Sequence, residues 1–394
     1  MISRNDAFRI LLDTLNPGQR RAVDAIEGPV LVVAGPGTGK THILAARVGK
    51  ILLETDTRPQ NVLCLTFTDA GVNAMRARLL EMIGPDAYRV PISTFHGFCN
   101  RVIQENMEYF GHGNLEPVSD LERIEIVRDL LAKLPPEHPL REGRKNAFAY
   151  ENHLRDLFAT MKKEDWTPGL VLKTADMFVQ SLPGDPAYTY QRNTAHARKG
   201  DPKTEIIAEM TTRMERLKAA ADLYPKYLHA MERAGRYEYE DMILWVLRAF
   251  QKHEALLRSY QERYLYVQVD EFQDTNGAQY HLLRRLLEYW ESPNAFIVGD
   301  DDQSIYEFQG ARLGNLLDFH DRYRDGLEIV VLTENYRSTQ PILDTAAGLI
   351  ARNTLRAVRQ LDEPLEKNLH AHTSETGELL LRSYKNRLCE LTDV

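Results

Sequence analysis

Short apolar runs rich in β-branched residues alternate with longer helical patterns along most of the chain. The five runs span residues 29–34, 61–67, 264–270, 294–300 and 327–333. Continuous apolar runs of this length are typical of strands buried on both faces. Their alternation with helices predicts a parallel sheet flanked by helices, so the expected fold class is α/β.

The alternation stops between about residues 106 and 235. This segment is rich in Arg, Lys, Glu and Leu at helical spacing, and proline pairs interrupt it. We interpret it as a helical insertion into an α/β domain. Within it, residues 182–203 combine turn residues with basic and tyrosine side chains, which is typical of a surface loop or of a loop that contacts a nucleic-acid strand.

The composition is that of a globular protein. The 394 residues are 43% apolar and 27% charged, and this length suggests two or three domains. A formal net charge of −8 excludes a chain coated in positive charge but allows a local positive groove for nucleic acid.

Targeting and redox signals are weak. No window approaches the roughly 18 uncharged apolar residues of a membrane span, and the N-terminus lacks the apolar core of a signal peptide. The three cysteines are far apart and form no CxxC pair, so neither a disulfide framework nor a zinc ribbon is indicated. We therefore expect a cytoplasmic protein.

A glycine-rich loop joins the first predicted strand to a helix. Its residues are Ala34, Gly35, Pro36, Gly37, Thr38, Gly39, Lys40 and Thr41. Glycines let backbone N–H groups surround phosphate oxygens, Lys40 can reach the terminal phosphates, and Thr41 can ligate Mg²⁺. The strand and helix on either side favour a phosphate-binding loop over a glycine-rich turn without a ligand, although Ala34 stands where glycine is usual.

A carboxylate pair follows the run at 264–270. Asp270, at the expected strand tip, is placed to hold Mg²⁺, and Glu271 is the candidate general base. Alone, such a pair is usually a solvated turn. Together with the phosphate-binding loop, the pair becomes a specific signal for hydrolysis at a phosphate site with Mg²⁺ as cofactor.

Seven segments resemble, in order, the motifs of the UvrD/Rep/PcrA-like group of superfamily 1 DNA helicases. They are Leu15–Gln19, Leu65–Thr68, Thr94–Cys99, Glu238–Ile243, Val269–Asn276, Gly299–Tyr306 and Glu334–Ser338. The resemblance implies a P-loop NTPase with a RecA-like sheet. It also implies a motor that moves 3′ to 5′ along single-stranded DNA or a 3′-tailed duplex and separates strands.

The resemblance also implies a domain layout. The first RecA-like lobe would comprise residues 1–105 and 236–329, interrupted by the helical insertion at 106–235. Residues 330–394 would begin a second, incomplete lobe, with a helix at 341–353 and a strand at 377–384. The later motifs of the family are absent, so we expect the N-terminal part of a longer helicase, either an expressed fragment or a truncated gene product. Such a chain should bind Mg-ATP, turn it over poorly and not unwind processively.

By the same resemblance, five side chains serve the nucleotide. Gln19 would read the adenine edge, and Arg47 and Tyr336 would stack on either side of the base. Gln303 would couple the γ-phosphate to the DNA side, and Arg337 would stabilise the transition-state charge.

A second set would contact DNA. Aromatic rings suit sequence-independent stacking on bases, and hydroxyl and imidazole groups suit phosphate contacts. The candidates are Phe67, Tyr306 and Phe308 for stacking, Thr68, Thr94 and His96 for phosphates, and Phe95 within the TFHGF segment. For Phe95 and its neighbour Phe98, core packing is the alternative.

Four positions depart from the family pattern by losing or reversing positive charge near the expected DNA path. They are Asp69, Ala70, Glu307 and Gln309. We therefore expect weaker phosphate contacts and a shallower salt dependence than in basic relatives, unless Arg198 and Lys199 compensate.

Two other classes of function stay open. One alternative is a nucleotide-binding interaction module that has lost motor activity. The other is an RNA-directed NTPase, since stacking aromatics do not distinguish sugars. The retained Lys40, Asp270, Glu271, Gln303 and Arg337 favour a motor over a module, because a binding module needs neither a general base nor an arginine finger.

Overall fold

The computed structural model describes most of the chain as two compact units. The described residues are 4–111, 115–141, 147–193, 196–303, 313–352, 365, 367–373, 379–380, 382–393. One unit, the α/β unit, comprises Met1–Thr94, Arg258–Thr275 and Leu286–Val394, and the other, the helical unit, comprises Phe95–Leu257 and Asn276–Arg285. Among the described helices, none combines the length and the low charge that a bilayer span requires.

The α/β unit is built on a parallel sheet. Its strands are β1 (Val30–Ala34), β2 (Val62–Thr66), β3 (Ile92–Thr94), β6 (Tyr266–Val269), β7 (Ala295–Gly299) and β8 (Glu328–Leu332). They lie in the order β3-β2-β6-β7-β1-β8, and every pair is parallel. The predicted α/β parallel sheet is confirmed.

The strand order explains where chemistry can gather. β7 lies between β1 and β6, and parallel strands end at the same edge of the sheet. The segments that follow these three strands are the glycine-rich loop, Asp300 and the Asp270–Glu271 pair. The topology therefore brings the three predicted motifs side by side.

Helices complete this unit. They are α1 (Arg4–Asp13), α2 (Pro17–Asp24), α3 (Lys40–Glu54), α4 (Asp69–Ile83), α14 (Leu313–Tyr323), α15 (Gln340–Ile350) and α16 (Arg387–Asp393), while α12 (Glu254–Arg263) spans the boundary of the units. α2 packs on α3, and α3 packs on α4. Val32, Ile43 and Leu79, from β1, α3 and α4, belong to one buried apolar cluster that fills this core.

One expectation about the C-terminal part was wrong, and another is not met by the residues that the structure describes. β8 pairs with β1 in the main sheet, so a boundary at residue 330 would cut through a strand of that sheet. Among the described residues at 377–384, none is in a strand, whereas a short parallel pair joins β9 (Glu334–Asn335) to β10 (His370–Ala371). The expected helix at 341–353 is present as α15.

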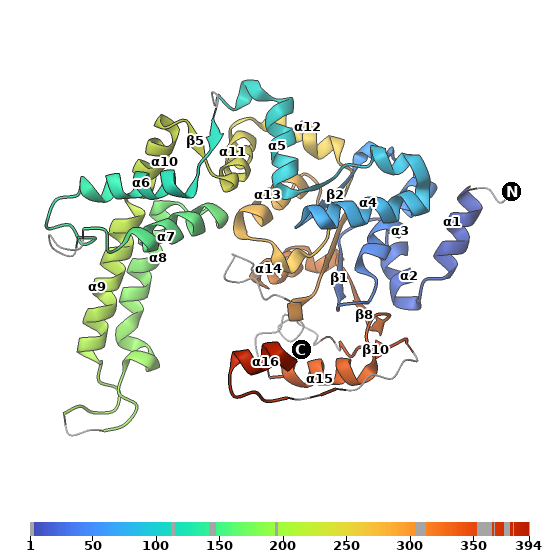
Figure 1. Cartoon of the computed structure of the whole chain (residues 1–394). Helices are drawn as coiled ribbons and strands as arrows, with labels where there is room; N and C mark the ends of the chain where they lie inside the picture. The colour runs from blue at the N-terminus through green and yellow to red at the C-terminus, as the bar shows by residue number, and fades with distance from the viewer. Residues whose placement is uncertain are drawn as a thin grey trace. The chain divides into compact units, whose positions relative to one another are not determined.

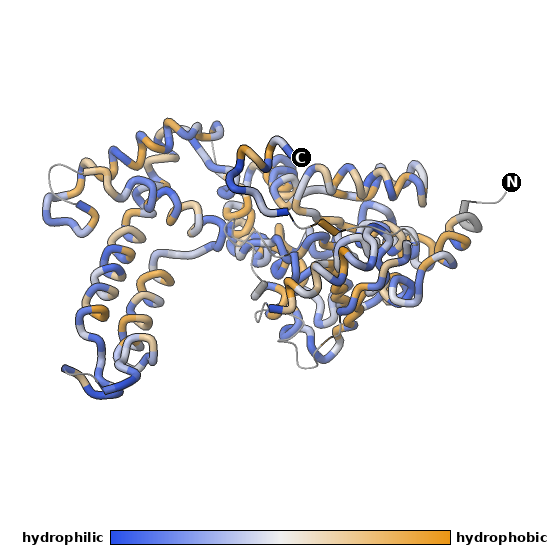
Figure 2. The backbone as a smooth tube through the Cα atoms, turned by 60° about the horizontal axis from the view of Figure 1, so that its bottom comes forward, coloured by the Kyte–Doolittle hydropathy of each residue, from blue (hydrophilic) through white to orange (hydrophobic). Residues whose placement is uncertain are grey.

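The helical unit matches the expectation of a helix-rich segment. Its helices are α5 (Phe95–Glu105), α6 (Asp120–Ala132), α7 (Glu151–Lys163), α8 (Pro168–Ser181), α9 (Thr204–Ala221), α10 (Tyr224–Arg233), α11 (Tyr239–Lys252) and most of α13 (Gly277–Leu287). A short parallel pair joins β4 (Glu116–Pro117) to β5 (Arg236–Tyr237). Apolar and polar residues alternate along its helices (Figure 2), as expected where one face of each helix is buried.

This unit extends beyond the expected insertion because α5 and α11 pack against each other. The predicted loop at 182–203 lies at the tip of the α8–α9 pair (Figure 1). There the Tyr188 ring packs edge-on against Phe178 of α8, at 6.2 Å between centroids.

A buried ion-pair cluster fixes the start of α11. Lys162 is fully buried, with its Nζ 2.5 Å from a Glu238 oxygen and 2.8 Å from a carboxylate oxygen of Asp241. Glu238 caps α11 in a reciprocal box with Asp241. This places the Glu238–Ile243 motif at a helix N-terminus held by a buried lysine.

Candidate active site

The glycine-rich loop wraps tightly between β1 and α3. Gly37 and Gly39 have φ values of 74° and 91°, which side chains with a Cβ rarely adopt. A Cβ on Gly37 would lie 2.6 Å from the Cβ of Arg337. The buried Thr38 donates from its hydroxyl to the carbonyl of Gly35 at 2.8 Å. The loop therefore has the glycines and the wrapped shape that a phosphate group requires.

Gln19 and Tyr336 approach this loop from opposite ends of the sequence. Asn16 caps α2 and forms a reciprocal box with Gln19, whose amide also donates to the carbonyl of Thr38 at 2.9 Å. The backbone N–H of Tyr336 donates to the carbonyl of Gly37 at 2.8 Å, and its hydroxyl accepts from the Asn16 amide at 2.9 Å. The Tyr336 side chain remains 45% exposed.

Lys40 faces the carboxylate pair. Its Nζ lies 2.6 Å from Oε2 of Glu271. Glu271 is one of the two described non-glycine residues with positive φ, at 50°, and strained backbone of this kind is concentrated at functional sites. The neighbouring Asp270 is buried, and burial, together with the charge of Glu271, raises its pKa to about 6.

These groups fit a divalent cation. Asp270 offers a buried carboxylate and Thr41 a half-buried hydroxyl at the first turn of α3. Oxygen ligands of this type suit Mg²⁺. A positive charge would also offset the burial that raises the pKa of Asp270 to about 6.

Gln273 is a residue that the sequence analysis missed. Its amide donates to Oε2 of Glu271 at 2.8 Å, and its Oε1 accepts the backbone N–H of Asp300 at 2.9 Å. Gln273 thus connects the ends of β6 and β7. A glutamine between acidic residues, just after an apolar run, is a sequence signal that could have identified it.

Gln303 lies in the turn after β7. Its amide donates to the carboxylate of Asp300, and its backbone N–H donates to the Asp300 carbonyl at 3.1 Å. The predicted DNA contacts Tyr306 and Phe308, as well as Glu307 and Gln309, lie outside the described residues.

Asn335 is a second residue that the sequence analysis missed. It is fully buried, and its amide donates to the carbonyl of Pro36 in the loop. Its side-chain oxygen accepts from the backbone N–H groups of Arg337 and Ser338 at 2.9 and 2.7 Å. Asn335 therefore fixes the backbone of the exposed Arg337 beside Gly37, where the two residues approach each other.

The position of Arg47 does not fit adenine stacking. Its side chain is 1% exposed, its guanidinium donates to the carbonyls of Ala25 and Ile26, and it lies over the Phe296 ring at 4.5 Å. Burial lowers its pKa to about 9. With both terminal nitrogens hydrogen-bonded and one face covered by Phe296 inside the core, Arg47 ties α3 to the end of α2.

Three candidate DNA contacts lie in the α/β unit. Phe67 is half-buried after β2, and Thr68 is exposed and caps α4 by accepting the N–H of Gly71 at 3.1 Å. Thr94 is half-buried at the end of β3. Asp69 begins α4, where its negative charge suits the helix N-terminus.

Two further candidates lie at the start of α5 in the helical unit. The Phe95 ring is 1% exposed and Phe98 is fully buried, so the expectation that Phe95 stacks on bases is not met and core packing accounts for both rings. His96 is half-buried, and burial lowers its pKa. A neutral imidazole can donate one hydrogen bond to a phosphate.

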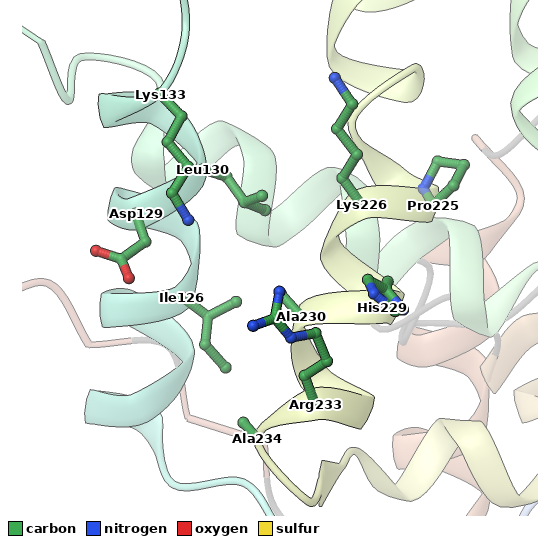
Figure 3. A pocket seen from close by; sticks show the side chains of 10 residues that line it. All are labelled: Ile126, Asp129, Leu130, Lys133, Pro225, Lys226, His229, Ala230, Arg233 and Ala234. Carbon is green, nitrogen blue, oxygen red and sulfur yellow. The ribbon is translucent and has the colours of Figure 1, made fainter.

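A separate pocket of about 610 Å³ lies wholly within the helical unit, between α6 and α10 (Figure 3). Leu130 of α6 and Arg233 of α10 point into the space between these helices. None of the predicted nucleotide or DNA contacts within the described part of the chain lines this pocket.

Comparison with known proteins identifies the family. The profile of the UvrD/REP helicase N-terminal domain matches residues 15–324. The chain is 28% identical to the ATP-dependent DNA helicase PcrA of Bacillus subtilis over 373 residues, 93% of this chain and 44% of that protein. It is 30% identical to the PcrA protein of Staphylococcus aureus over 352 residues, 89% of this chain and 42% of that protein. The chain thus spans less than half the length of these curated relatives. Because the family profile matches most of its residues, the chain belongs to the UvrD/REP helicase family.

Proposed function

We propose that this chain is the ATP-binding and single-strand-binding part of an ATP-dependent DNA helicase that moves 3′ to 5′. The observation that carries the proposal is the 2.6 Å approach of Lys40 to Glu271, between the glycine-rich loop and the end of β6. Lysine and carboxylate meet there beside a loop shaped for phosphate. A structural ion pair alone would need neither the two positive-φ glycines nor the strained backbone of Glu271.

ATP binding would change the partner of the Lys40 ammonium. The terminal phosphates would take the Lys40 ammonium from Glu271, because a phosphate carries more charge than a carboxylate. Glu271 would then be free to accept a proton from the attacking water. Arg337, whose backbone Asn335 fixes beside Gly37, would place its guanidinium on the γ-phosphate side.

Magnesium would be held by Thr41 and Asp270. When bound, it would neutralise charge on the phosphates. Gln19 and Tyr336 flank the loop near Thr38 and Gly37 and would contact the base.

On the DNA side, Phe67 would stack on bases, and Thr68, Thr94 and His96 would contact phosphates. Tyr306 and Phe308 would add stacking surfaces. Because the sequence has acidic or neutral residues at positions 69, 70, 307 and 309, where a helicase of this type would carry more positive charge, affinity for single strands would depend weakly on salt.

The test is steady-state ATP hydrolysis with and without single-stranded DNA, compared with Lys40→Ala and Glu271→Gln. We expect low turnover that DNA raises severalfold and that each substitution lowers by about 100-fold. A rate indifferent to both substitutions would exclude the proposed site. A matched RNA strand that stimulates as well as DNA would instead favour an RNA-directed NTPase.

A further inference from the structure

A lysine from late in the chain lies against the end of β7. The side chain of Lys367 is 2% exposed, and its Nζ contacts the carboxylates of Asp300, Asp301 and Asp302. The distances to Asp301 and Asp302 are 3.1 and 2.8 Å, and the contact with Asp300 is closer. Lysines are almost never buried unless paired, so this ammonium and these carboxylates stabilise one another.

The ammonium of Lys367 contacts all three carboxylates of the cluster. One carboxylate oxygen from each of the three aspartates lies within 4.8 Å of those of the other two, close enough to share a positive charge. Lys367 provides that charge, and although burial opposes it, the three carboxylates raise its pKa above the usual value. Removing the Lys367 charge would take from all three carboxylates an ammonium that offsets their mutual repulsion in a largely buried turn.

Asp300 shares its carboxylate between Lys367 and Gln303. Its Oδ1 contacts Nζ of Lys367, and its Oδ2 accepts from the amide of Gln303. The backbone N–H of Asp302 also donates to Oδ1, at 3.1 Å. The position of the Gln303 side chain is therefore tied to the ammonium of Lys367 through one carboxylate.

A continuous series of contacts runs from Lys367 to the phosphate-binding loop. From Asp300, the backbone N–H donates to Gln273 at 2.9 Å, and the Gln273 amide donates to Glu271 at 2.8 Å. Glu271 in turn contacts Nζ of Lys40 at 2.6 Å. Each step is a direct hydrogen bond or ion pair between side chains or a backbone N–H.

The segment that carries Lys367 also lies against the loop itself. A Cβ on Gly35 would lie 2.9 Å from Cδ1 of Leu369, two residues after Lys367. His370 donates from its backbone N–H to Thr333 at 2.8 Å, and β10 pairs with β9 beside Arg337. One short segment therefore contacts the loop, the acidic turn and the strand that leads to Arg337.

We propose that Lys367 is a positioning residue of the ATP site. Its ammonium holds the Asp300 turn, so that Gln303 and Gln273 keep their places on Asp300 and Glu271 keeps its place beside Lys40. The inference rests on the proposed ATP hydrolysis and adds to it a residue that contacts none of the reacting groups. Lys367 also makes the arrangement of catalytic groups depend on the segment at residues 367–371.

The test compares Lys367→Met, which removes the charge and keeps the length, with Lys367→Arg in the whole chain. We expect Lys367→Met to lower kcat for ATP at least tenfold while changing KM less than threefold, because Lys40 and the loop remain. Lys367→Arg should recover part of kcat, since it retains a cation. An unchanged kcat in Lys367→Met would overturn the proposal.

Lys162→Met is the matched control. It also removes a fully buried lysine from two carboxylates, but in the helical unit. The two variants are compared under conditions in which the same fraction of each is folded. If loss of stability alone explained the lower kcat of Lys367→Met, Lys162→Met would show the same decrease in kcat. That result would also overturn the proposal.

Hydrogen exchange provides a readout independent of turnover. In Lys367→Met, the backbone amides of residues 271–274 and 300–303 should exchange at least tenfold faster than in the parent chain, and Lys162→Met should leave them unchanged. If the parent chain does not hydrolyse ATP at all, the proposed function fails, and exchange alone decides the role of Lys367. Unchanged exchange in Lys367→Met would then refute it.

Discussion

Replacing Arg47 by methionine should destabilise the α/β unit while leaving the affinity for Mg-ATP nearly unchanged. The Arg47 guanidinium donates to two buried carbonyls, those of Ala25 and Ile26. Hydrogen bonds from a charged donor contribute about 1.5 to 3 kcal/mol each. Methionine removes the desolvation cost of the charge and keeps part of the packing on Phe296, so we expect a net loss of about 3 kcal/mol.

Urea unfolding followed by circular dichroism measures the first effect, and titration of Mg-ATP into the folded protein measures the second. Tyr336→Ala is the matched control, because its side chain is 45% exposed and adjoins the loop. It should weaken Mg-ATP binding about tenfold, as expected for loss of one stacked ring, with little change in stability. A stable Arg47→Met variant that binds Mg-ATP tenfold more weakly would refute the structural role and restore the stacking role.

Three further substitutions test other parts of the site. Gly37→Ala should lower Mg-ATP affinity at least tenfold, since φ is 74° and the new Cβ would lie 2.6 Å from the Cβ of Arg337. The control Gly326→Ala, whose new Cβ would have no atom of the described residues within 4 Å, should bind Mg-ATP normally. Equal affinities of the two variants would contradict the prediction. Burial lowers the pKa of His96 below its usual 6.5, so the folded state binds the proton less readily than the unfolded state. The contribution of neutral His96 to thermal stability should therefore be fully present above pH 6.5 and should be lost as the pH falls below that value. His96→Gln should lessen this loss of stability at low pH. Parallel curves of thermal stability against pH for the two proteins would exclude a contribution from His96. Asp69→Lys should add one phosphate contact and so steepen the slope of log affinity for single strands against log salt concentration by about 0.7. An unchanged slope would place residue 69 away from the DNA.

The strands were predictable because buried parallel strands are short continuous apolar runs. β1, β2, β6, β7 and β8 each lie within a predicted run. β3 was missed because three residues, Ile92–Thr94, are too few for a pattern. The assignment of β8 to the main sheet was also missed, because an apolar run specifies a strand but not its neighbour.

Helix geometry explains the two residues whose expected roles the structure does not support. Arg47 follows Lys40 by seven residues, which corresponds to about 10 Å along α3, so its side chain packs well below the loop. Phe95, Phe98, Cys99 and Val102 follow the spacing of one helix face and are all buried. The spacing alone was therefore evidence for core packing.

The residues that the sequence did not reveal act over long sequence separations. Asn335 contacts Pro36, and Lys367 contacts Asp300, in each case across dozens or hundreds of residues. Nothing in the local pattern around Lys367 distinguishes it from an exposed lysine. Such contacts depend on tertiary packing that periodicity and local motifs do not encode.

The most direct test of the central claim is calorimetric titration of Mg-ATP into the parent chain, Lys40→Ala and Glu271→Gln. If the loop holds the phosphates and Lys40 leaves Glu271 to contact them, the parent chain should bind Mg-ATP. Lys40→Ala should then bind Mg-ATP at least tenfold more weakly. Glu271→Gln should bind as tightly as the parent or more tightly, because Lys40 no longer has to leave a carboxylate. Equal binding by Lys40→Ala and the parent chain would contradict the assignment of residues 34–41 as the ATP site.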